Sequence, residues 1–587
     1  MLKRTLSRVG KSVQPKPVEA PKRTTLHGAI VRALETASTP VTSVAVLPAA
    51  TPTDVTEWLH ELVPGAGVTE FGPDLTPSEL HVQMAASGRF DLIVDTSTGR
   101  GRYERAHELV MRLRAGGVLV VRLLPRKIRV KEGGAARRRA DADRRALASL
   151  FGGVAHAAVA RLYAESGKNV NDAERLGLVV DQPFLHAGHL IVKNRAEVLA
   201  KIREEEVGGL LDLRGSDFGS VLHVIPGLVF ESRAKVHESV PDPMAPLKAS
   251  YDVPDMALRV YHDALCVPGQ IVAKDNVLLP DTFRHNQSAR NGNRYLVEVG
   301  PRFAMLPETT EPVALAGSYF YLDSEFRGHF GHAVTEVISR LWAWGRAKQI
   351  APDLKALMCM NKDRHLAQYE VDLFGAAGIP AEDIVFSYEP VRVESLYAAT
   401  PMFSQPAYVH PEIETTWRRI GDALVTGVAL EPDTPRRIFV SRRLSKRPCH
   451  NRQEVEALFE EHGFTIVFPE DSPLGAQVAL FRSAEVIAGF SGSGLFNVTF
   501  ASEPKHLIMV GSESYTARNE HMIAAVLGHR VDIATCPSDN ERTVTGHWKQ
   551  GSFHAGFTYE PDSPGGMHLR AVLAALDHPA RDGSTTP

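Results

Sequence analysis

Apolar and polar residues alternate in a strand-and-helix pattern over the first 200 residues of the chain. VTSVAVLPA (41–49), FDLIVDTS (90–97) and VLVVRLLP (118–125) are short apolar runs of the kind found in buried strands. Amphipathic segments such as YERAHELVMRLRAGG (103–117) lie between them and predict helices. Strands that alternate with helices indicate a parallel sheet, so we expect a Rossmann-like three-layer domain over residues 26–200.

The same alternation returns after residue 316, whereas residues 205–315 contain short strand-like runs separated by turns. HAVTEVISRLWAWGRAKQ (332–349) predicts a helix of about four turns. RRIFVSR (436–442) and EVIAGF (485–490) predict strands, and each runs into a polar or glycine-rich loop. This region is expected to fold around a second parallel sheet.

A chain of 587 residues is too long for one hydrophobic core. We predict a basic flexible tail over residues 1–25 and the Rossmann-like domain over 26–200. Two further halves are expected over 201–410 and 411–576, followed by a flexible tail at 577–587.

Composition excludes several classes of protein. A content of 44% hydrophobic and 23% charged residues is that of a soluble globular protein, and a net charge of −3 gives no general attraction to nucleic acid. No apolar run reaches the length of a membrane span. The four cysteines form no CxxC pair, which favours a reducing compartment, so we expect a cytoplasmic protein. The basic N-terminus suggests a peripheral contact with the inner face of the membrane as the secondary alternative.

The N-terminal domain resembles a class I methyltransferase. The resemblance rests on FDLIVD followed by RAGGVLVV, at the places of the family's fourth and fifth strands. The family's glycine-rich cofactor loop is replaced by LPAATPTD (47–54), which has no glycine. A degenerate, structural domain is therefore the main expectation, and an active methyltransferase or an unrelated three-layer domain are the alternatives.

Three clusters after residue 316 have residue types suited to chemistry. The first, which we call the histidine segment, is HFGHAVTEVISRL (329–341). His332, Glu336 and Arg340 are four residues apart, so a helix would place them on one face as a base, a carboxylate and a cation. A helix-surface pair without catalytic function is the alternative, and a metal site formed with His329 is a less favoured one.

The second cluster, the arginine loop, is SRRLSKRPCHN (441–451), which follows a predicted buried strand. Its arginines, among them Arg442 and Arg447, offer planar donor groups that match a diphosphate. The third, the glycine loop, is GFSGSGLF (489–496), between a predicted strand and a predicted helix. Backbone N–H groups at such a place favour an anion or a ribose. A solvated basic turn and a tight structural turn are the respective alternatives.

Taken together, the order and spacing of the clusters resemble glycosyltransferase family 61. The matching text is GHFGHAVTEVISRLW, RRIFVSRR with RPCHNRQEVEALFEEHGF, and AQVALFRSAEVIAGFSGSGLFNVTFA. The sequence departs from the family at Ser491, where a histidine is common, and at Ala333, where a bulky aromatic residue is usual.

The resemblance implies a GT-B fold, in which two Rossmann-like halves hold donor and acceptor. It also implies an inverting reaction that needs no metal and no cofactor other than the nucleotide-sugar substrate. The base would be His332, oriented by Glu336, with Asp323 in reserve. The donor would be held by a second set of residues: Arg442, Arg447, Gly492, Ser493, Gly494 and Asn497.

The expected partners are a nucleotide sugar and a glycan acceptor in surface or capsular polysaccharide synthesis. Two other functions remain open from the sequence. One is a non-catalytic protein that binds sugars or nucleotides, and the other is a bifunctional methyltransferase and glycosyltransferase.

Overall fold

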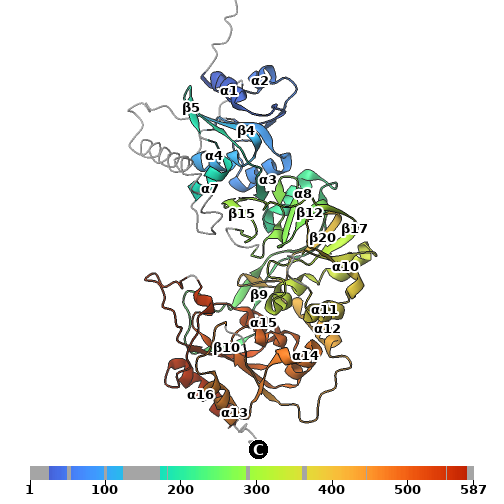
Figure 1. Ribbon diagram of the computed structural model, residues 1–587, viewed down its shortest axis with the longest axis vertical. Coiled ribbons are helices and arrows are strands. Elements are labelled where there is room, and N and C mark those ends of the chain that lie inside the picture. The colour runs from blue at the N-terminus through green and yellow to red at the C-terminus, as the bar shows by residue number, and fades with distance from the viewer. Residues whose placement is uncertain are drawn as a thin grey trace, which may run out of the picture. The chain divides into compact units, whose positions relative to one another are not determined.

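The computed structural model describes most of the chain, in the following ranges: 25–48, 55–97, 102–122, 172–181, 183–285, 291–359, 366–443, 446–549 and 551–577. The expected basic tail up to residue 24, most of the glycine-free LPAATPTD loop and the expected C-terminal tail after residue 577 lie outside these ranges. The described chain forms two compact units (Figure 1). The first comprises residues up to 80 and 89–198, and the second comprises 81–88 and 199–587.

The first unit contains a six-stranded sheet of order β2-β1-β3-β4-β6-β5. Strands β1 to β4 are parallel, and β6 runs antiparallel to both neighbours. The strands are β1 (Ser43–Leu47), β2 (Gly67–Glu70), β3 (Phe90–Asp95), β4 (Leu113–Arg122), β5 (Phe184–His186) and β6 (His189–Lys193). The helices are α1 (Thr25–Thr36), α2 (Val55–Leu62), α3 (Pro77–Ser87), α4 (Arg102–Val110) and α7 (Asp172–Val179).

Two expectations for helix ends were wrong. The helix predicted over 103–117 ends at Val110, because residues from Leu113 already pair with β3 across an irregular register. The segment EVLAKIREEE (197–206) also has the pattern of a helix, but it begins with the short strand β7 (Leu199–Lys201), and the helix α8 spans Glu204–Arg214. In both places pairing with a sheet outweighs local helix propensity.

The second unit contains an eleven-stranded mixed sheet. Its order is β15-β16-β7-β14-β13-β12-β20-β17-β18-β19, with β8 paired to β12. Its strands besides β7 are β8 (Gly219–Ile225), β12 (Met256–Val267), β13 (Ile271–Lys274), β14 (Val277–Leu278), β15 (Val297–Gly300), β16 (Phe303–Met305), β17 (Val313–Tyr321), β18 (Lys355–Cys359), β19 (Ile384–Ser387) and β20 (Val391–Ala399). In this sheet β7 pairs with β14 in parallel and β17 to β20 are joined in parallel, whereas the other pairs are antiparallel. The strands from β17 onward are therefore parallel to one another, as expected, but here they are part of a mixed sheet.

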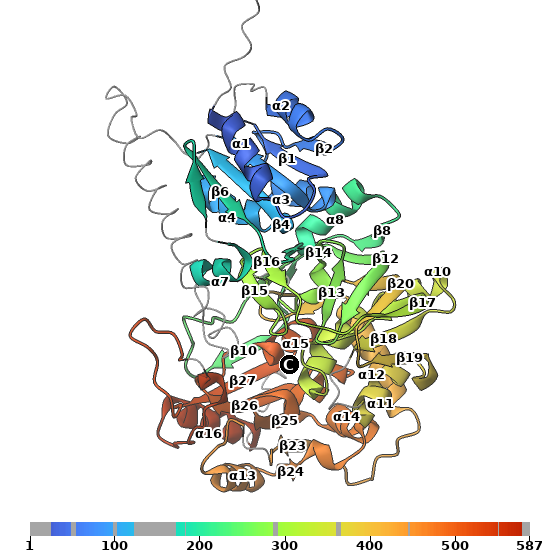
Figure 2. The same ribbon diagram turned by 45° about the horizontal axis from the view of Figure 1, so that its top comes forward.

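The second unit also contains a six-stranded sheet that is parallel throughout, with the order β10-β27-β26-β25-β23-β24 (Figure 2). The strands are β23 (Arg437–Val440), β24 (Thr465–Val467), β25 (Val486–Phe490), β26 (His506–Ser512) and β27 (Arg530–Cys536), joined by β10 (Lys235–Glu238) from much earlier in the chain. The remaining strands form two small pairs, β9 (Leu228–Glu231) with β11 (Ser250–Val253) and β21 (Phe403–Ser404) with β22 (Tyr408–Val409).

Helices cover both faces of the parallel sheet, because successive side chains of a strand point to opposite faces and the central strands are apolar at successive positions. In β25, Val486, Ala488 and Phe490 pack in one core with α13 (Arg452–Glu461) and α16 (Pro564–Asp577). Ile487 packs on the opposite face in the core of the remaining helices. These are α10 (Trp344–Ile350), α11 (Gln368–Ala376), α12 (Ile413–Val425), α14 (Leu474–Ser483) and α15 (Asn519–Leu527).

Candidate active site

The parallel sheet has a point at which its strand order reverses. After β23 the chain adds β24 on one side and then returns to add β25 on the other side. The loops that leave β23 and β25 therefore diverge and open a crevice, which is where open α/β sheets bind their ligands. These two loops are the arginine loop and the glycine loop.

Arg442 connects the two loops. Its Nη2 donates to the carbonyl oxygen of Ser491 at 2.9 Å, and its guanidinium lies 5.3 Å from the centre of the Phe490 ring. Burial and the nearby charge of Arg447 lower the pKa of Arg442 to about 10, so the group remains a cation at neutral pH. Arg443 instead turns outward and pairs with Asp471.

Arg447 lies against the glycine loop. Its guanidinium stacks on Tyr515 and Phe553, 4.8 and 5.2 Å from the ring centres, and its buried Nε has no hydrogen-bond partner among the described residues. Its backbone has a φ of 53°, in the left-handed region. A Cβ added to Gly492 would lie only 2.7 Å from Nη2 of Arg447, so only a glycine lets the two come this close.

One backbone amide of the glycine loop already donates a hydrogen bond within the protein. The N–H of Gly492, whose φ is 136°, donates to the buried carboxylate of Glu520 at 2.7 Å. Ser493 and Gly494 begin the predicted helix, which is the 3-10 helix η7 (Ser493–Phe500). The first N–H groups of a helix have no acceptor inside it, so these two amides are the ones suited to a ligand. Gly494 packs closely against Val440, since a Cβ added to Gly494 would lie 3.3 Å from the Val440 side chain.

This arrangement makes Gly492 the glycine to test. Gly492→Ala is expected to displace Arg447 and to weaken nucleoside-diphosphate binding by about tenfold, which corresponds to about 1.4 kcal/mol. Gly463→Ala is the matched control, because Gly463 also has a positive φ, of 75°, but a Cβ there would meet nothing within 4 Å. Calorimetric titration of both variants checks this, and equal affinities would show that the approach of Arg447 to Gly492 is unimportant.

The histidine segment is not one continuous helix. It contains α9 (Phe330–His332), a π-helical turn η3 (Ala333–Val337) and a 3-10 turn η4 (Ile338–Arg340), after which α10 begins at Trp344. The expected single helix over 332–349 is thus interrupted, and such π-helical turns are frequent at functional sites. The contact implied by the spacing is nevertheless present, with Nδ1 of His332 at 2.9 Å from Oε1 of Glu336.

The cation beside Glu336 is Arg284 rather than Arg340. Nε of Arg284 donates to Oε1 of Glu336 at 2.6 Å, whereas Arg340 donates to the backbone carbonyl of Asp323 at 2.9 Å. Burial by itself raises the pKa of Glu336, but the hydrogen bond with His332 and the charge of Arg284 outweigh it and lower the pKa to about 2. Glu336 is therefore a carboxylate at neutral pH, and it fixes the orientation of the imidazole.

The ring of His332 is held on its face as well. Phe326 stacks on it with centroids 4.4 Å apart and an interplanar angle of 17°, while Arg284 and Arg294 lie over Phe326. No described residue hydrogen-bonds Nε2, which leaves that nitrogen for a substrate. The neighbouring His329 has a lowered pKa of about 4, because burial and the charges of His332, Lys446 and Arg447 disfavour its protonated form.

The histidine segment also touches the glycine loop. A Cβ added to Gly331 would lie 2.9 Å from Cβ of Ser493 and 3.1 Å from the Phe496 ring, so α9 and η7 are in close contact. The three clusters that are far apart in the sequence thus form one site in the second unit. Among the described side chains, no group of three or more histidines, cysteines, aspartates or glutamates could hold a metal ion, including the group formed with His329.

The part of the sequence that forms this site matches a known protein family. Residues 330–508 match the family model described as Glycosyltransferase 61, and this range contains the arginine loop, the glycine loop and all of the histidine segment except His329. Residues 330–508 are therefore a glycosyltransferase 61 domain, which supports glycosyltransferase activity.

No curated protein matches this chain at a significant level. Two solved structures resemble part of it. MycE methyltransferase from the mycinamycin biosynthetic pathway in complex with Mg and SAH is 12% identical, with a TM-score of 0.22 over 29% of this chain and 48% of that one. The same enzyme with Mg, SAH and mycinamycin VI is 11% identical, with a TM-score of 0.19 over 27% and 46%. The match spans about half the length of these methyltransferases, and likeness at this level does not bear on fold or activity.

Two sequence-predicted site residues of the glycosyltransferase serve mainly to hold the fold. Asp323 has no exposed surface, and its carboxylate accepts the backbone N–H groups of Gln270 and Ser324, each at 2.9 Å. Burial raises its pKa to about 6, against the lowering effect of Arg327 and these N–H groups. Asn497 is also buried and donates to the side chain of Gln477 on α14 at 2.9 Å, which anchors η7.

The depressed pKa of Glu336 makes stability depend on pH. A group whose pKa falls on folding contributes stability above its unfolded value of about 4.5, and loses it as pH falls toward about 2. Glu336→Gln should therefore melt several degrees below the wild type near pH 7, with the difference shrinking between about pH 4.5 and 2. Thermal melting of both proteins across this range checks it, and a difference that does not change with pH would show that the charge of Glu336 is not responsible.

Among the described helices, none is both long enough and apolar enough to cross a bilayer. All four cysteines of the glycosyltransferase are free thiols.

Proposed function

We propose that the enzyme moves a sugar from a nucleoside-diphosphate donor to a hydroxyl group of a glycan. The observation that supports this best is the junction of three elements at one place. The arginine loop meets the glycine loop through Arg442 and Ser491, and the glycine loop meets α9 through Ser493 and Gly331. A diphosphate site and a candidate base are then neighbours, as transfer from a diphosphate leaving group requires.

In this proposal Arg442, Arg447 and the amides of Ser493 and Gly494 hold the diphosphate. Their charges and N–H groups neutralise the leaving group, so that no metal ion is needed. Gly492 is present for its lack of a side chain, because its amide already bonds to Glu520. Asn497 supports the loop from the side of α14 and does not touch the nucleotide.

His332 acts as the general base. The acceptor oxygen attacks the anomeric carbon, its proton passes to Nε2, and the bond from that carbon to the diphosphate oxygen breaks. Glu336 accepts from Nδ1 and stabilises the imidazolium that forms. A single displacement of this kind inverts the anomeric configuration. Asp323, the reserve base, has no exposed surface and cannot meet an acceptor in this conformation, so the proposal does not use it.

The mixed sheet with the histidine segment forms the acceptor side and the parallel sheet forms the donor side, in a GT-B arrangement. Following the family resemblance, the acceptor is a surface or capsular polysaccharide, made at the inner face of the membrane. The test is incubation of the purified enzyme with a panel of nucleotide sugars, with NMR of the released sugar. Slow donor hydrolysis with inverted configuration is expected. No turnover together with tight binding would favour the non-catalytic alternative.

The third alternative, a bifunctional methyltransferase, depends on the first unit. We predict that residues 26–200 do not bind S-adenosylmethionine, because LPAATPTD would place side chains and proline where a glycine loop cradles the cofactor. Calorimetric titration of the whole enzyme with S-adenosylmethionine should give no heat of binding. Binding in the micromolar range would establish a second active site.

A further inference from the structure

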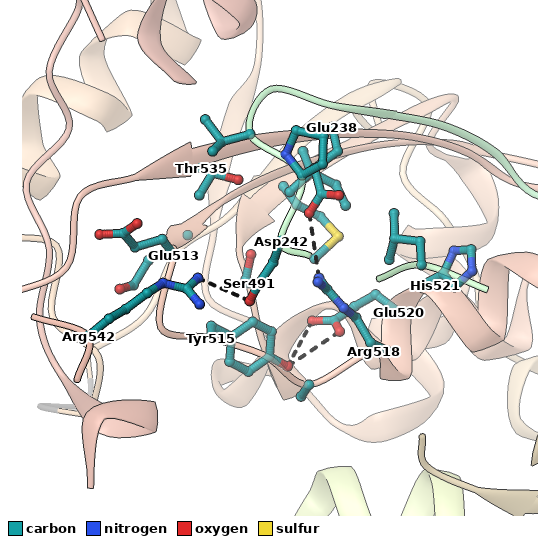
Figure 3. A pocket seen from close by; sticks show the side chains of 18 residues that line it. Glu238, Asp242, Ser491, Glu513, Tyr515, Arg518, Glu520, His521, Thr535 and Arg542 are labelled. Carbon is teal, nitrogen blue, oxygen red and sulfur yellow. Dashed lines mark hydrogen bonds and ion pairs between the residues drawn. The ribbon is translucent and has the colours of Figure 1, made fainter. Parts of the chain in front are cut away.

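A buried carboxylate lies directly behind the glycine loop. Glu520, near the start of α15, is 1% exposed, and its Oε1 accepts the N–H of Gly492 at 2.7 Å. The hydroxyl of Tyr515 donates to the same carboxylate, 3.2 and 3.3 Å from its two oxygens (Figure 3). The guanidinium of Arg447 in turn stacks on the ring of Tyr515. Glu520 thus holds the backbone of Gly492 directly, and it holds the ring on which Arg447 stacks through its hydrogen bond with Tyr515.

The negative charge of Glu520 is only partly balanced by the positive charges around it. Arg447 and Arg442 attract it through space, but neither forms an ion pair with it among the contacts of the described residues. The nearest arginine along the chain, Arg518, is committed to Glu238 at 3.6 Å and to the carbonyl of Ala245. Other titratable groups of the same pocket are His521, Asp242, Glu513 and Arg542. Burial raises the pKa of Glu520, and the N–H of Gly492, the Tyr515 hydroxyl and Arg447 offset this only in part.

We propose that Glu520 is a positioning residue of the donor site, which holds Gly492 beside Arg447 and takes up a proton when the donor diphosphate binds. This inference rests on the proposed function, because it needs the diphosphate at the glycine loop. A bound diphosphate brings negative charge close to the carboxylate and draws Arg442 and Arg447 to itself. A buried carboxylate that loses its compensating charge becomes protonated, and the proton comes from solvent. The carbonyl oxygen of the neutral acid still accepts the N–H of Gly492.

The sign of the effect follows from linkage. Binding that takes up a proton weakens as pH rises. In the wild type, calorimetric titration with UDP, GDP and ADP should therefore show lower affinity at pH 8 than at pH 6. Titrations in two buffers with different ionisation enthalpies give the number of protons taken up.

Glu520→Gln is the decisive variant, since its amide oxygen can still accept from Gly492 while it cannot titrate. Its proton uptake should be lower than that of the wild type by up to about one proton per nucleotide. Because both proteins are titrated with the same nucleotide and buffers, the ionisation of the nucleotide cancels in this difference. Affinity at pH 8 should equal or exceed that of the wild type.

Glu520→Ala removes the hydrogen bonds as well, so its affinity should be about tenfold below that of Glu520→Gln at every pH. Tyr515→Phe keeps the ring under Arg447 and should retain the proton uptake. Equal uptake in the wild type and Glu520→Gln would overturn the inference, as would equal affinities of Glu520→Ala and Glu520→Gln. A wild type that binds none of the three nucleotides would overturn the proposed function itself. Binding that does not depend on Glu520 would overturn this inference alone.

Discussion

Replacement of His332 by alanine is expected to lower the transfer rate by about 100- to 10,000-fold, the usual contribution of a general base. Donor binding should stay close to that of the wild type. The reason is geometric, because Nδ1 of His332 is taken by Glu336 and only Nε2 is left for an acceptor hydroxyl. In the proposed function the diphosphate is held by other residues. Steady-state transfer to an acceptor, combined with calorimetric titration of the nucleotide, separates the two quantities.

Two further histidines make this test specific. His60 on α2 is exposed and belongs to the first unit, so His60→Ala should leave both quantities unchanged. His329→Ala removes a ring that is 4.8 Å from that of His332 and should cause a smaller loss of rate than His332→Ala. If His332→Ala kept its turnover and lost donor affinity, His332 would be a donor ligand or a packing residue and not the base.

Local features of the site could be predicted from the sequence. The contact between His332 and Glu336 follows from their spacing of four residues, and it survives even though the segment changes from α-helix to a π turn. The strands β23 and β25 were evident as apolar runs, but their adjacency, which places Arg442 next to Ser491, comes from the structure. Periodicity encodes the contact of His332 with Glu336 because the two residues are neighbours on successive turns of one segment.

Contacts over long sequence distances could not be predicted in this way. Arg284 comes from a region in which no chemistry was evident, 52 residues before Glu336. Glu520 follows Gly492 by 28 residues and belongs to a helix that has no catalytic motif. Strand β10 joins the parallel sheet from the other half of the unit, against β27. Each of these depends on tertiary packing, which leaves no period in the sequence.

The role of Asp323 shows a different limit. Asp323 is an acidic residue that follows a strand and lies in a polar segment, so the sequence alone makes it a candidate catalytic group. Its surroundings, two backbone N–H donors and Arg327 in a site without exposed surface, are those of a structural anchor. Burial and partners decide between these roles, and the sequence specifies neither.

Arg442→Ala is expected to weaken nucleoside-diphosphate binding by roughly ten- to a hundred-fold, since a hydrogen bond to a charged group is worth about 1.5–3 kcal/mol. Arg442 is suited to this role because it spans the crevice between β23 and β25 as a desolvated cation. Arg443→Ala is the matched control. The guanidinium of Arg443 is the next in the chain, but it is half exposed, pairs with Asp471 and lies over Phe468, so its loss should not change the affinity.

The same variant tests whether protein groups alone neutralise the leaving diphosphate. The wild type should keep its activity in EDTA, and Mg²⁺ should not restore activity to Arg442→Ala. No DxD pair lies near the three clusters in the sequence, because Asp141 and Asp143, which form such a pair, belong to the predicted N-terminal domain and lie outside the described residues. A hydrated Mg²⁺ could replace part of the lost charge, but it has no carboxylate cluster among the described residues of the site to hold it. Activity that disappears in EDTA and returns with a divalent ion would contradict the metal-independent mechanism, whatever the affinity of the Arg442 variant.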